Sequence, residues 1–176
     1  MNSKMIPIAV INPDAPAESL EAKQPAIDNG AEIYGKDGYF SAEQMQREWD
    51  KVWTESWLIA GVSTDLPTLG DYFLFRVRSE SVIVTRTEKG IKAFYNVCPH
   101  RGARLLTEER GNKKVFVCPF HSWSFRNNGE LRTITDEETF QEPVICHRPG
   151  LTPVACEELA GLIFVSMANT PPSLKE

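Results

Sequence analysis

Four side chains that can bind a metal occur in two short segments of this sequence. Cys98-Pro99-His100 forms the first segment, and Cys118-Pro119-Phe120-His121 forms the second. Two thiolates and two imidazoles can hold a [2Fe–2S] cluster, in which the thiolates bind one iron and the imidazoles bind the other. The same four ligands also suit a tetrahedral zinc ion. The spacing therefore predicts a metal centre held between two loops.

The order of the ligands favours the cluster over zinc. Zinc fingers usually present two cysteines followed by two histidines, whereas cysteine and histidine alternate here. Pro99 and Pro119 stiffen the loops and remove backbone donors, and Gly102 permits a tight backbone path. The backbone N–H groups that remain can point at sulfur, which stabilises the reduced cluster.

A helix is expected upstream of these loops. Ser41-Ala42-Glu43-Gln44 has the pattern of a capping box with Ser41 as N-cap. Apolar residues at helical spacing follow it, which predicts a helix over 42–54. The residues on its apolar face are Met45, Trp49, Val52 and Trp53. Residues 1–33 contain four prolines and little periodicity, which indicates a flexible extension before a helical segment at 34–56.

Beyond the helix the pattern changes to short strands. Runs rich in β-branched and aromatic residues predict strands at 57–60, 72–77, 81–86, 91–95, 114–117, 123–126, 131–133 and 162–167. Asn127-Asn128-Gly129 predicts a hairpin turn. Strands of this length and frequency indicate an antiparallel sandwich or barrel. Since Cys98 and Cys118 each follow a strand, the two metal-binding loops should project from a sheet.

Composition limits the class of protein. The chain has 176 residues, of which 41% are hydrophobic and 24% charged, as in a globular domain. Its formal charge of −5 argues against a nucleic-acid partner. No apolar run approaches the roughly 18–20 residues that cross a bilayer, and residues 5–11 do not resemble a signal peptide. A cytoplasmic location without membrane contact is expected.

The remaining cysteines and histidine are expected to have structural roles. Cys146 and Cys156 are predicted to be reduced thiols packed as small hydrophobic side chains. His147 is the third and last histidine of the chain. It is expected at the surface or in a hydrogen bond, because adjacent residues such as Cys146 and His147 rarely point into one small site.

The two metal-binding segments resemble the Rieske domain of ring-hydroxylating (Rieske non-haem iron) oxygenase α-subunits. The resemblance rests on Asn96–Ala103 and Cys118–Phe125, and it extends to the turn at 66–72 and the closing strand at 162–165. It covers about residues 40–170. It implies a mainly β fold, an antiparallel β-sandwich with a two-loop cluster-binding subdomain and a short N-terminal helix. The Rieske domain would span 57–170, and 171–176 would be a linker stub.

The same resemblance implies roles for particular residues. The [2Fe–2S] ligands would be Cys98, His100, Cys118 and His121, surrounded by Arg101, Gly102 and Trp123. Respiratory Rieske proteins carry an additional cysteine in each loop, joined as a disulfide. Ala103 and Phe120 occupy those places here. The chain therefore resembles the lower-potential oxygenase and ferredoxin type.

The resemblance implies one-electron transfer from a ferredoxin or reductase to the mononuclear iron of an oxygenase. In the family that iron is held by two histidines and a carboxylate in a catalytic domain, and it lies on a neighbouring subunit of a trimer. Only His147 is left for such a site. The chain is thus expected to be the N-terminal Rieske part of an oxygenase, without the oxygen-activating iron.

Two other functions stay open at this point. A stand-alone Rieske-type ferredoxin would carry the same ligands, although Cys98 lies later in this chain than the first ligand of such carriers. A zinc-stabilised binding module is the third possibility.

Positive charge is concentrated around the predicted centre. Residues 98–126 have a net charge of +4 in a chain of −5, and their cations are Arg101, Arg104, Arg110, Lys113, Lys114 and Arg126. A basic rim would steer an acidic ferredoxin or reductase to the centre. Ordinary surface ion pairing is the alternative explanation.

The midpoint potential of the bound cluster is expected to fall as the pH rises through the alkaline range. A metal-bound neutral histidine can lose the proton on its outer ring nitrogen, and oxidation of the iron favours that loss because it adds positive charge. Protein-film voltammetry from about pH 6 to about pH 11 measures this dependence. A potential that stays flat over this range contradicts it.

Overall fold

A computed structural model describes residues 35–140 and 150–174 of the chain. The chain divides into two compact units, residues 1–44 and 45–176. The helices are α2 (Asp37–Phe40), α3 (Ala42–Glu48) and the π-helical turn η1 (Trp49–Trp53). The backbone N–H of Gln44 donates to Ser41 Oγ at 3.2 Å, which confirms Ser41 as the N-cap. No helix among the described residues is long and apolar enough to cross a membrane.

The expected helix over 42–54 is present, but its last turn widens. Thr54 N–H donates to the carbonyl of Trp49, five residues earlier, at 3.1 Å, which is the π-helical pattern. The apolar face that predicted the helix is largely uncovered, since Met45, Val52 and Trp53 are exposed among the described residues. The pattern thus predicted the helix correctly, although its apolar face is not buried within the described part of the chain.

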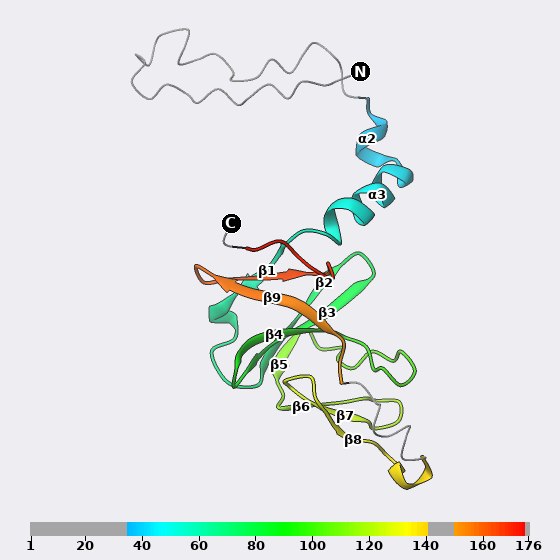
Figure 1. Cartoon of the computed structure of the whole chain (residues 1–176), viewed down its shortest axis with the longest axis vertical. Coiled ribbons are helices and arrows are strands. Elements are labelled where there is room, and N and C mark those ends of the chain that lie inside the picture. The colour runs from blue at the N-terminus through cyan, green and yellow to red at the C-terminus, as the bar shows by residue number, and fades with distance from the viewer. Residues whose placement is uncertain (1–34, 141–149, 175–176) are drawn as a thin grey trace. The chain divides into compact units, whose positions relative to one another are not determined.

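Ten antiparallel strands in the described part of the chain form two sheets (Figure 1). The larger sheet has the strand order β1-β10-β9-β4-β3-β2-β5, and the smaller has the order β6-β7-β8. The strands are β1 (Leu58–Val62), β2 (Asp71–Val77), β3 (Glu80–Thr87), β4 (Gly90–Tyr95), β5 (Arg110–Asn112), β6 (Val115–Val117), β7 (Ser124–Arg126), β8 (Leu131–Thr133), β9 (Pro153–Leu159) and β10 (Leu162–Ser166). Short 3-10 turns lie at η2 (Ser63–Asp65) and η3 (Glu137–Thr139). The mainly β, antiparallel fold expected from the sequence is confirmed.

Two strands, β5 and β9, were not predicted. β5 consists of Arg-Gly-Asn and is exposed throughout, so it lacks the apolar alternation that marks a strand. β9 begins with Pro153 and contains adjacent glutamates at 157 and 158. Both strands exist because a neighbour pairs with them: β2 pairs with β5, and β9 lies between β10 and β4.

The larger sheet curls so that its two ends pack on each other. Gly61 of β1 lies against the ring of Phe73 in β2, where an added Cβ would stand 2.9 Å from the ring carbon Cζ. These strands are far apart in the sheet order, so the contact requires the two ends to face each other. One apolar core fills the space between them, and it includes Leu66, Phe73, Val82, Val84, Ile91, Ala93, Val154, Ile163 and Val165.

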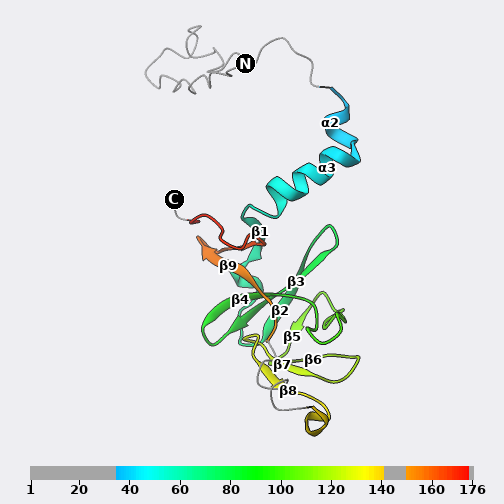
Figure 2. The same ribbon diagram turned by 45° about the vertical axis from the view of Figure 1, so that its right-hand side comes forward.

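The smaller sheet lies at one end of the larger one, as both views show (Figures 1 and 2). The β7–β8 hairpin joins them, because Gly129 at its turn packs on the ring of Phe94 in β4. Leu151 N–H also donates to the Gly129 carbonyl at 2.8 Å. A second apolar core spans this junction and includes Tyr72, Phe94, Phe116, Trp123 and Phe125 together with both predicted metal-binding cysteines. The packing at Gly129 therefore sets the position of the smaller sheet.

Gly129→Ala is expected to destabilise the protein more than Gly90→Ala. Both glycines have left-handed backbones, with φ of +88° and +94°, so alanine costs about 1–2 kcal/mol of conformational energy at either position. A Cβ at position 90 meets nothing within 4 Å, whereas one at 129 overlaps the Phe94 ring. Overpacking adds about 1–3 kcal/mol. Urea unfolding of the two variants measures the difference, and equal midpoints would show that the hairpin does not depend on this contact.

Candidate metal centre

The first metal-binding loop is a tight turn that begins at Cys98, three residues after the end of β4. The backbone N–H of Cys98 donates to the carbonyl of Ala103 at 2.8 Å, and Gly102 N–H donates to the Cys98 carbonyl at 2.9 Å. Gly102 has a φ of +72°, and a side chain at this position would meet open space. The left-handed backbone of the turn, and not a close neighbour, therefore favours glycine at this position.

The second loop repeats the same turn immediately after β6. Cys118 N–H donates to the carbonyl of Trp123 at 2.8 Å, and Ser122 N–H donates to the Cys118 carbonyl at 3.0 Å. Ser122 takes the place of the glycine, with a φ of +56°. This left-handed serine was not predicted from the sequence, since serine carries no signal for such a backbone. The two loops thus present Cys98 and Cys118 in equivalent positions from two different sheets.

Both thiols are buried and face each other. Cys98 is 1% exposed and Cys118 is 2% exposed, and the two thiols are close enough to interact. Burial raises the pKa of the Cys98 thiol and Cys118 adds to the rise, while the backbone N–H groups of His100 and Arg101 act in the opposite direction. Two thiolates cannot occupy this apolar site without a cation. A metal that binds both thiolates would supply the missing positive charge.

The two imidazoles lie next to each other beside the thiols. The rings of His100 and His121 are 4.8 Å apart between centroids. His121 Nδ1 is buried and has no hydrogen-bond partner among the described residues. A buried nitrogen without a partner costs free energy, and coordination by a metal would remove that cost. Iron bound to imidazole therefore fits this part of the site.

Trp123 and Arg101 contact the predicted ligands in different ways. The indole of Trp123 is buried and stacks on the His100 ring, with centroids 4.4 Å apart and planes inclined by 3°. The stack fixes the orientation of His100. The side chain of Arg101 is exposed, and its contribution at Cys98 is a backbone N–H. Trp123 and Arg101 thus both lie at the predicted centre, one through its side chain and the other through its backbone.

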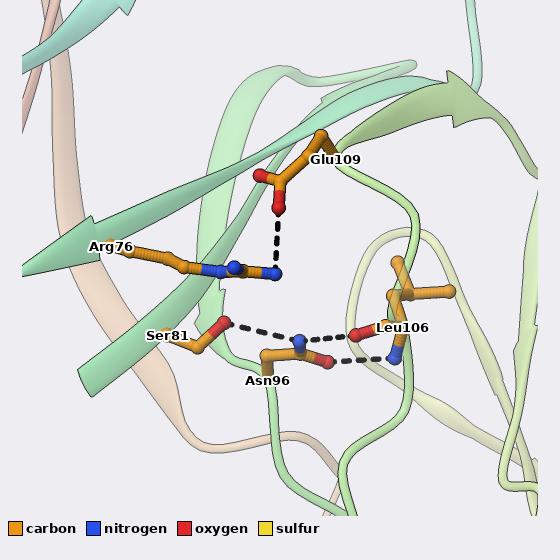
Figure 3. A network of polar contacts seen from close by, with 5 residues as sticks. All are labelled: Arg76, Ser81, Asn96, Leu106 and Glu109. Atoms are coloured by element: carbon orange, nitrogen blue, oxygen red, sulfur yellow. Dashed lines mark hydrogen bonds and ion pairs between the residues drawn. The ribbon is translucent and has the colours of Figure 1, made fainter. Parts of the chain in front are cut away.

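Asn96 holds the first loop in place, and sequence reasoning did not identify this role. Its side-chain oxygen accepts hydrogen bonds from the backbone N–H groups of Leu105 and Leu106, at 3.2 and 2.9 Å. Its amide nitrogen donates to the Leu106 carbonyl at 2.7 Å and to Ser81 Oγ at 3.1 Å (Figure 3). All four hydrogen-bonding positions of this buried amide are used. The loop that carries Cys98 and His100 is therefore closed at its base.

Two cations of the predicted basic rim are neutralised locally. Lys113 Nζ lies 3.6 Å from the Glu108 carboxylate, and Arg110 lies 3.2 Å from Asp65. For these two residues, ordinary ion pairing is the correct explanation. Arg101 and Arg104 are exposed on the first loop.

Only Cys156, of the two remaining cysteines and the third histidine, lies within the described residues. Cys156 is half-buried on β9 against the core of the larger sheet. Its burial raises the pKa of the thiol to about 12, which fits the prediction of a reduced, packed cysteine. Cys146 and His147 fall outside the described residues.

The imidazole side of the site opens on a cavity of about 250 Å³. His100, His121, Trp123, Asp136 and Phe140 are among its lining residues. In residues 35–140 and 150–174, no group of three or more His, Cys, Asp or Glu side chains is arranged around one metal ion. The two thiols interact with each other and the two imidazoles lie together, which is the division of ligands between the two irons of such a cluster.

Asn96→Asp is expected to lower the free energy of unfolding by about 2–4 kcal/mol. The aspartate can still accept hydrogen bonds from the backbone N–H groups of Leu105 and Leu106. Its second oxygen would face the Leu106 carbonyl, to which the asparagine amide donates, and it cannot donate a hydrogen bond there. The carboxylate also adds a buried charge. Asn128→Asp is the matched control, because exposed Asn128 only accepts from Glu130 N–H, at 3.1 Å, and aspartate keeps that bond. Urea unfolding followed by tryptophan fluorescence compares them. Equal stability of the two variants would contradict the role of Asn96.

Comparison with known proteins assigns this arrangement to a family. The sequence matches the Rieske [2Fe-2S] domain over residues 56–148. It is 31% identical over 164 residues to the glycine betaine monooxygenase oxygenase subunit of Chromohalobacter salexigens, covering 93% of this chain and 35% of that protein. It is 38% identical over 137 residues to the large oxygenase component of the naphthalene 1,2-dioxygenase system of Pseudomonas aeruginosa, covering 76% of this chain and 30% of that protein.

A solved structure shows the same fold. A quaternary ammonium Rieske monooxygenase, described with carnitine oxidation by gut microbiota and inter-subunit electron transfer, superposes with a TM-score of 0.70 at 29% identity. The match covers 79% of this chain and 38% of that one. The chain spans about a third of the length of the curated relatives that it matches. It belongs to the Rieske [2Fe–2S] domain family, in the form found in Rieske oxygenase subunits, and its cofactor is a [2Fe–2S] cluster.

Proposed function

We propose that this domain transfers single electrons through a [2Fe–2S] cluster held by Cys98, His100, Cys118 and His121. The observation that carries the proposal is the pairing of two buried thiols with two adjacent imidazoles, one of which has an unsatisfied buried nitrogen. The cluster, when bound, cycles between two oxidation states that differ by one electron. Imidazole ligands are neutral, so such a cluster has a higher potential than one with four thiolates.

The protein contributes hydrogen bonds and a fixed geometry. The backbone N–H groups of His100 and Arg101 point at Cys98 and favour negative charge on its sulfur. Trp123 holds the plane of His100 by stacking. The repeated turn keeps the two loops rigid, so little reorganisation is needed when the charge of the cluster changes. We propose Arg101, Gly102 and Trp123 as the residues that tune and support the centre.

Electrons would enter from a ferredoxin or reductase and leave toward the mononuclear iron of an oxygenase catalytic domain. The imidazole side is suited to the exit, because His100 and His121 are half-buried and line an open cavity. One apolar side chain beside them, Phe120, has its ring centroid 3.9 Å from that of His121 and is 58% exposed. Exposed apolar side chains of this size favour burial against another protein surface. The relative described with inter-subunit electron transfer supports an acceptor on a neighbouring subunit.

A stand-alone Rieske-type ferredoxin is the second candidate function. It would use the same four ligands and the same exposed face. The oxygenase assignment is favoured because the relatives named above are oxygenase subunits, and one of them aligns with 93% of this chain. We propose residues 57–170 as the Rieske domain, with the helical segment 34–56 preceding it. Glycine betaine monooxygenase and naphthalene 1,2-dioxygenase act on different compounds, so the similarity supports no particular substrate for this chain.

Cys118→Ser and His121→Ala are each expected to abolish the cluster signal. Either change removes one of the two protein ligands of an iron, and the remaining three ligands cannot complete the site. Cys156→Ser is the matched control, since Cys156 lies on β9 in the other core and should leave the signal intact. Iron content, visible absorption and the EPR spectrum of the reduced protein measure the outcome. A full EPR signal in Cys118→Ser would refute the proposed ligand set.

A further inference from the structure

A second surface of the cluster-binding region carries cations that form no ion pair with any described residue. It lies at the end of β6 and β7 that is remote from the metal-binding loops, beside the β3–β4 turn. A cavity of about 220 Å³ opens there, and Lys89, Lys114, Arg126 and Glu88 are among its lining residues. We call this cavity, defined by these four lining residues, the basic cavity.

The charges of the basic cavity are not balanced. It contains three cations and one carboxylate, and none of the three cations forms an ion pair with any residue in the described ranges. Lys113, next to Lys114 in the chain, is instead paired with Glu108 at 3.6 Å. A net positive surface is therefore present on a protein whose overall charge is −5. An anionic group would gain an interaction that no described residue supplies.

Hydrogen bonds hold the backbone around the basic cavity in place. Asn127 N–H donates to the Lys114 carbonyl at 3.1 Å, which links the ends of β6 and β7. The side-chain amide of Asn127 donates to the Arg86 carbonyl at 3.1 Å, which ties this hairpin to β3 of the larger sheet. The bases of the cationic side chains are thus fixed relative to one another. This surface needs no rearrangement of its backbone to meet a partner.

We propose that the basic cavity is the docking site for carboxylate side chains of an acidic electron-donor protein. The inference rests on the proposed function, and it adds the surface by which the donor is recognised. The cavity is smaller than the roughly 300–1,000 Å³ of typical small-molecule pockets, so it suits the tips of glutamate or aspartate side chains better than a nucleotide. The donor would lose one electron and the Rieske cluster would gain it, with no other reactant.

The position of the basic cavity allows the donor and the acceptor to use different faces. Lys114 and Cys118 lie at opposite ends of β6, four residues apart, which is about 13 Å along a strand. Arg126 and Trp123 lie in the same way at opposite ends of β7. The imidazole edges and the Phe120 ring stay free for the acceptor. A docked donor is therefore close to the cluster without covering the exit face.

The test compares Lys114→Gln/Arg126→Gln with Lys113→Gln in the cluster-loaded protein. The probe is a reduced plant-type [2Fe–2S] ferredoxin, which is acidic and whose all-cysteine cluster has the lower potential. Stopped-flow absorption measures reduction of the Rieske cluster at an ionic strength of about 10 mM, where the Debye length is roughly 30 Å. We expect the double variant to be reduced about fivefold more slowly than wild type and Lys113→Gln to differ by less than about twofold. At about 1 M ionic strength, with a Debye length of roughly 3 Å, the differences should vanish.

Two controls separate docking from damage to the cluster. Reduced methyl viologen is a cation, so the double variant should react with it as fast as wild type or slightly faster. Calorimetric titration of oxidised ferredoxin into each oxidised protein should show weaker binding for the double variant only, without any electron transfer. Inorganic pyrophosphate is titrated in parallel, and tight binding of it without an effect on the ferredoxin would identify a small-anion site and overturn the proposal.

The other possible outcomes distinguish a failure of docking at the basic cavity from a failure of the proposed electron-transfer function. Equal rates for all variants with ferredoxin, or equal slowing by Lys113→Gln, would overturn docking at the basic cavity while leaving the electron-transfer function intact. Absence of a Rieske EPR signal and of reduction by methyl viologen in the wild-type protein would instead overturn the proposed function itself.

Discussion

Burial of two thiols and an imidazole nitrogen in one apolar cluster is the constraint on which this structure depends. Cys98 and Cys118 belong to the same core as Phe116, Phe125 and Trp123. In such surroundings a thiolate or an unpaired ring nitrogen is costly unless a cation binds it. The site is therefore built to be completed by metal. The surrounding fold must keep the two pairs of ligands at a fixed separation.

Two sheets meet that requirement by presenting the same turn from two directions. One loop follows β4 of the larger sheet and the other follows β6 of the smaller sheet, and the hydrogen bonds of the two turns match. Their relative position depends on the junction at Gly129 and Phe94. The conformation of the first loop depends on Asn96, which ties its base to Leu105, Leu106 and Ser81. Ligand geometry is thus set by residues that need not touch the cluster.

Two surfaces of the cluster-binding region differ in charge and polarity. The face beside the imidazoles carries the exposed ring of Phe120, whereas cations that form no ion pair with a described residue gather at the far end of β6 and β7. Apolar contact favours a lasting interface and charge favours rapid encounter with a soluble carrier. This division fits a domain that receives electrons from one protein and passes them to another.

The sequence by itself determined the cofactor ligands that we propose, the mainly β class and most strands. Alternating apolar residues and the Cys-x-His and Cys-x-x-His spacings are local signals, so they can be read without knowing the fold. Four features were decided only by the tertiary structure: the β5 and β9 strands, the left-handed Ser122, the role of Asn96 and the pairing of Lys113. The β5 and β9 strands and the role of Asn96 depend on partners distant in sequence, as when the Asn96 amide meets the backbone of Leu106 across ten residues. The backbone of Ser122 and the pairing of Lys113 depend instead on the conformation of their own loops. Periodicity and composition carry no record of which distant groups will meet, because only packing of the two sheets brings them together.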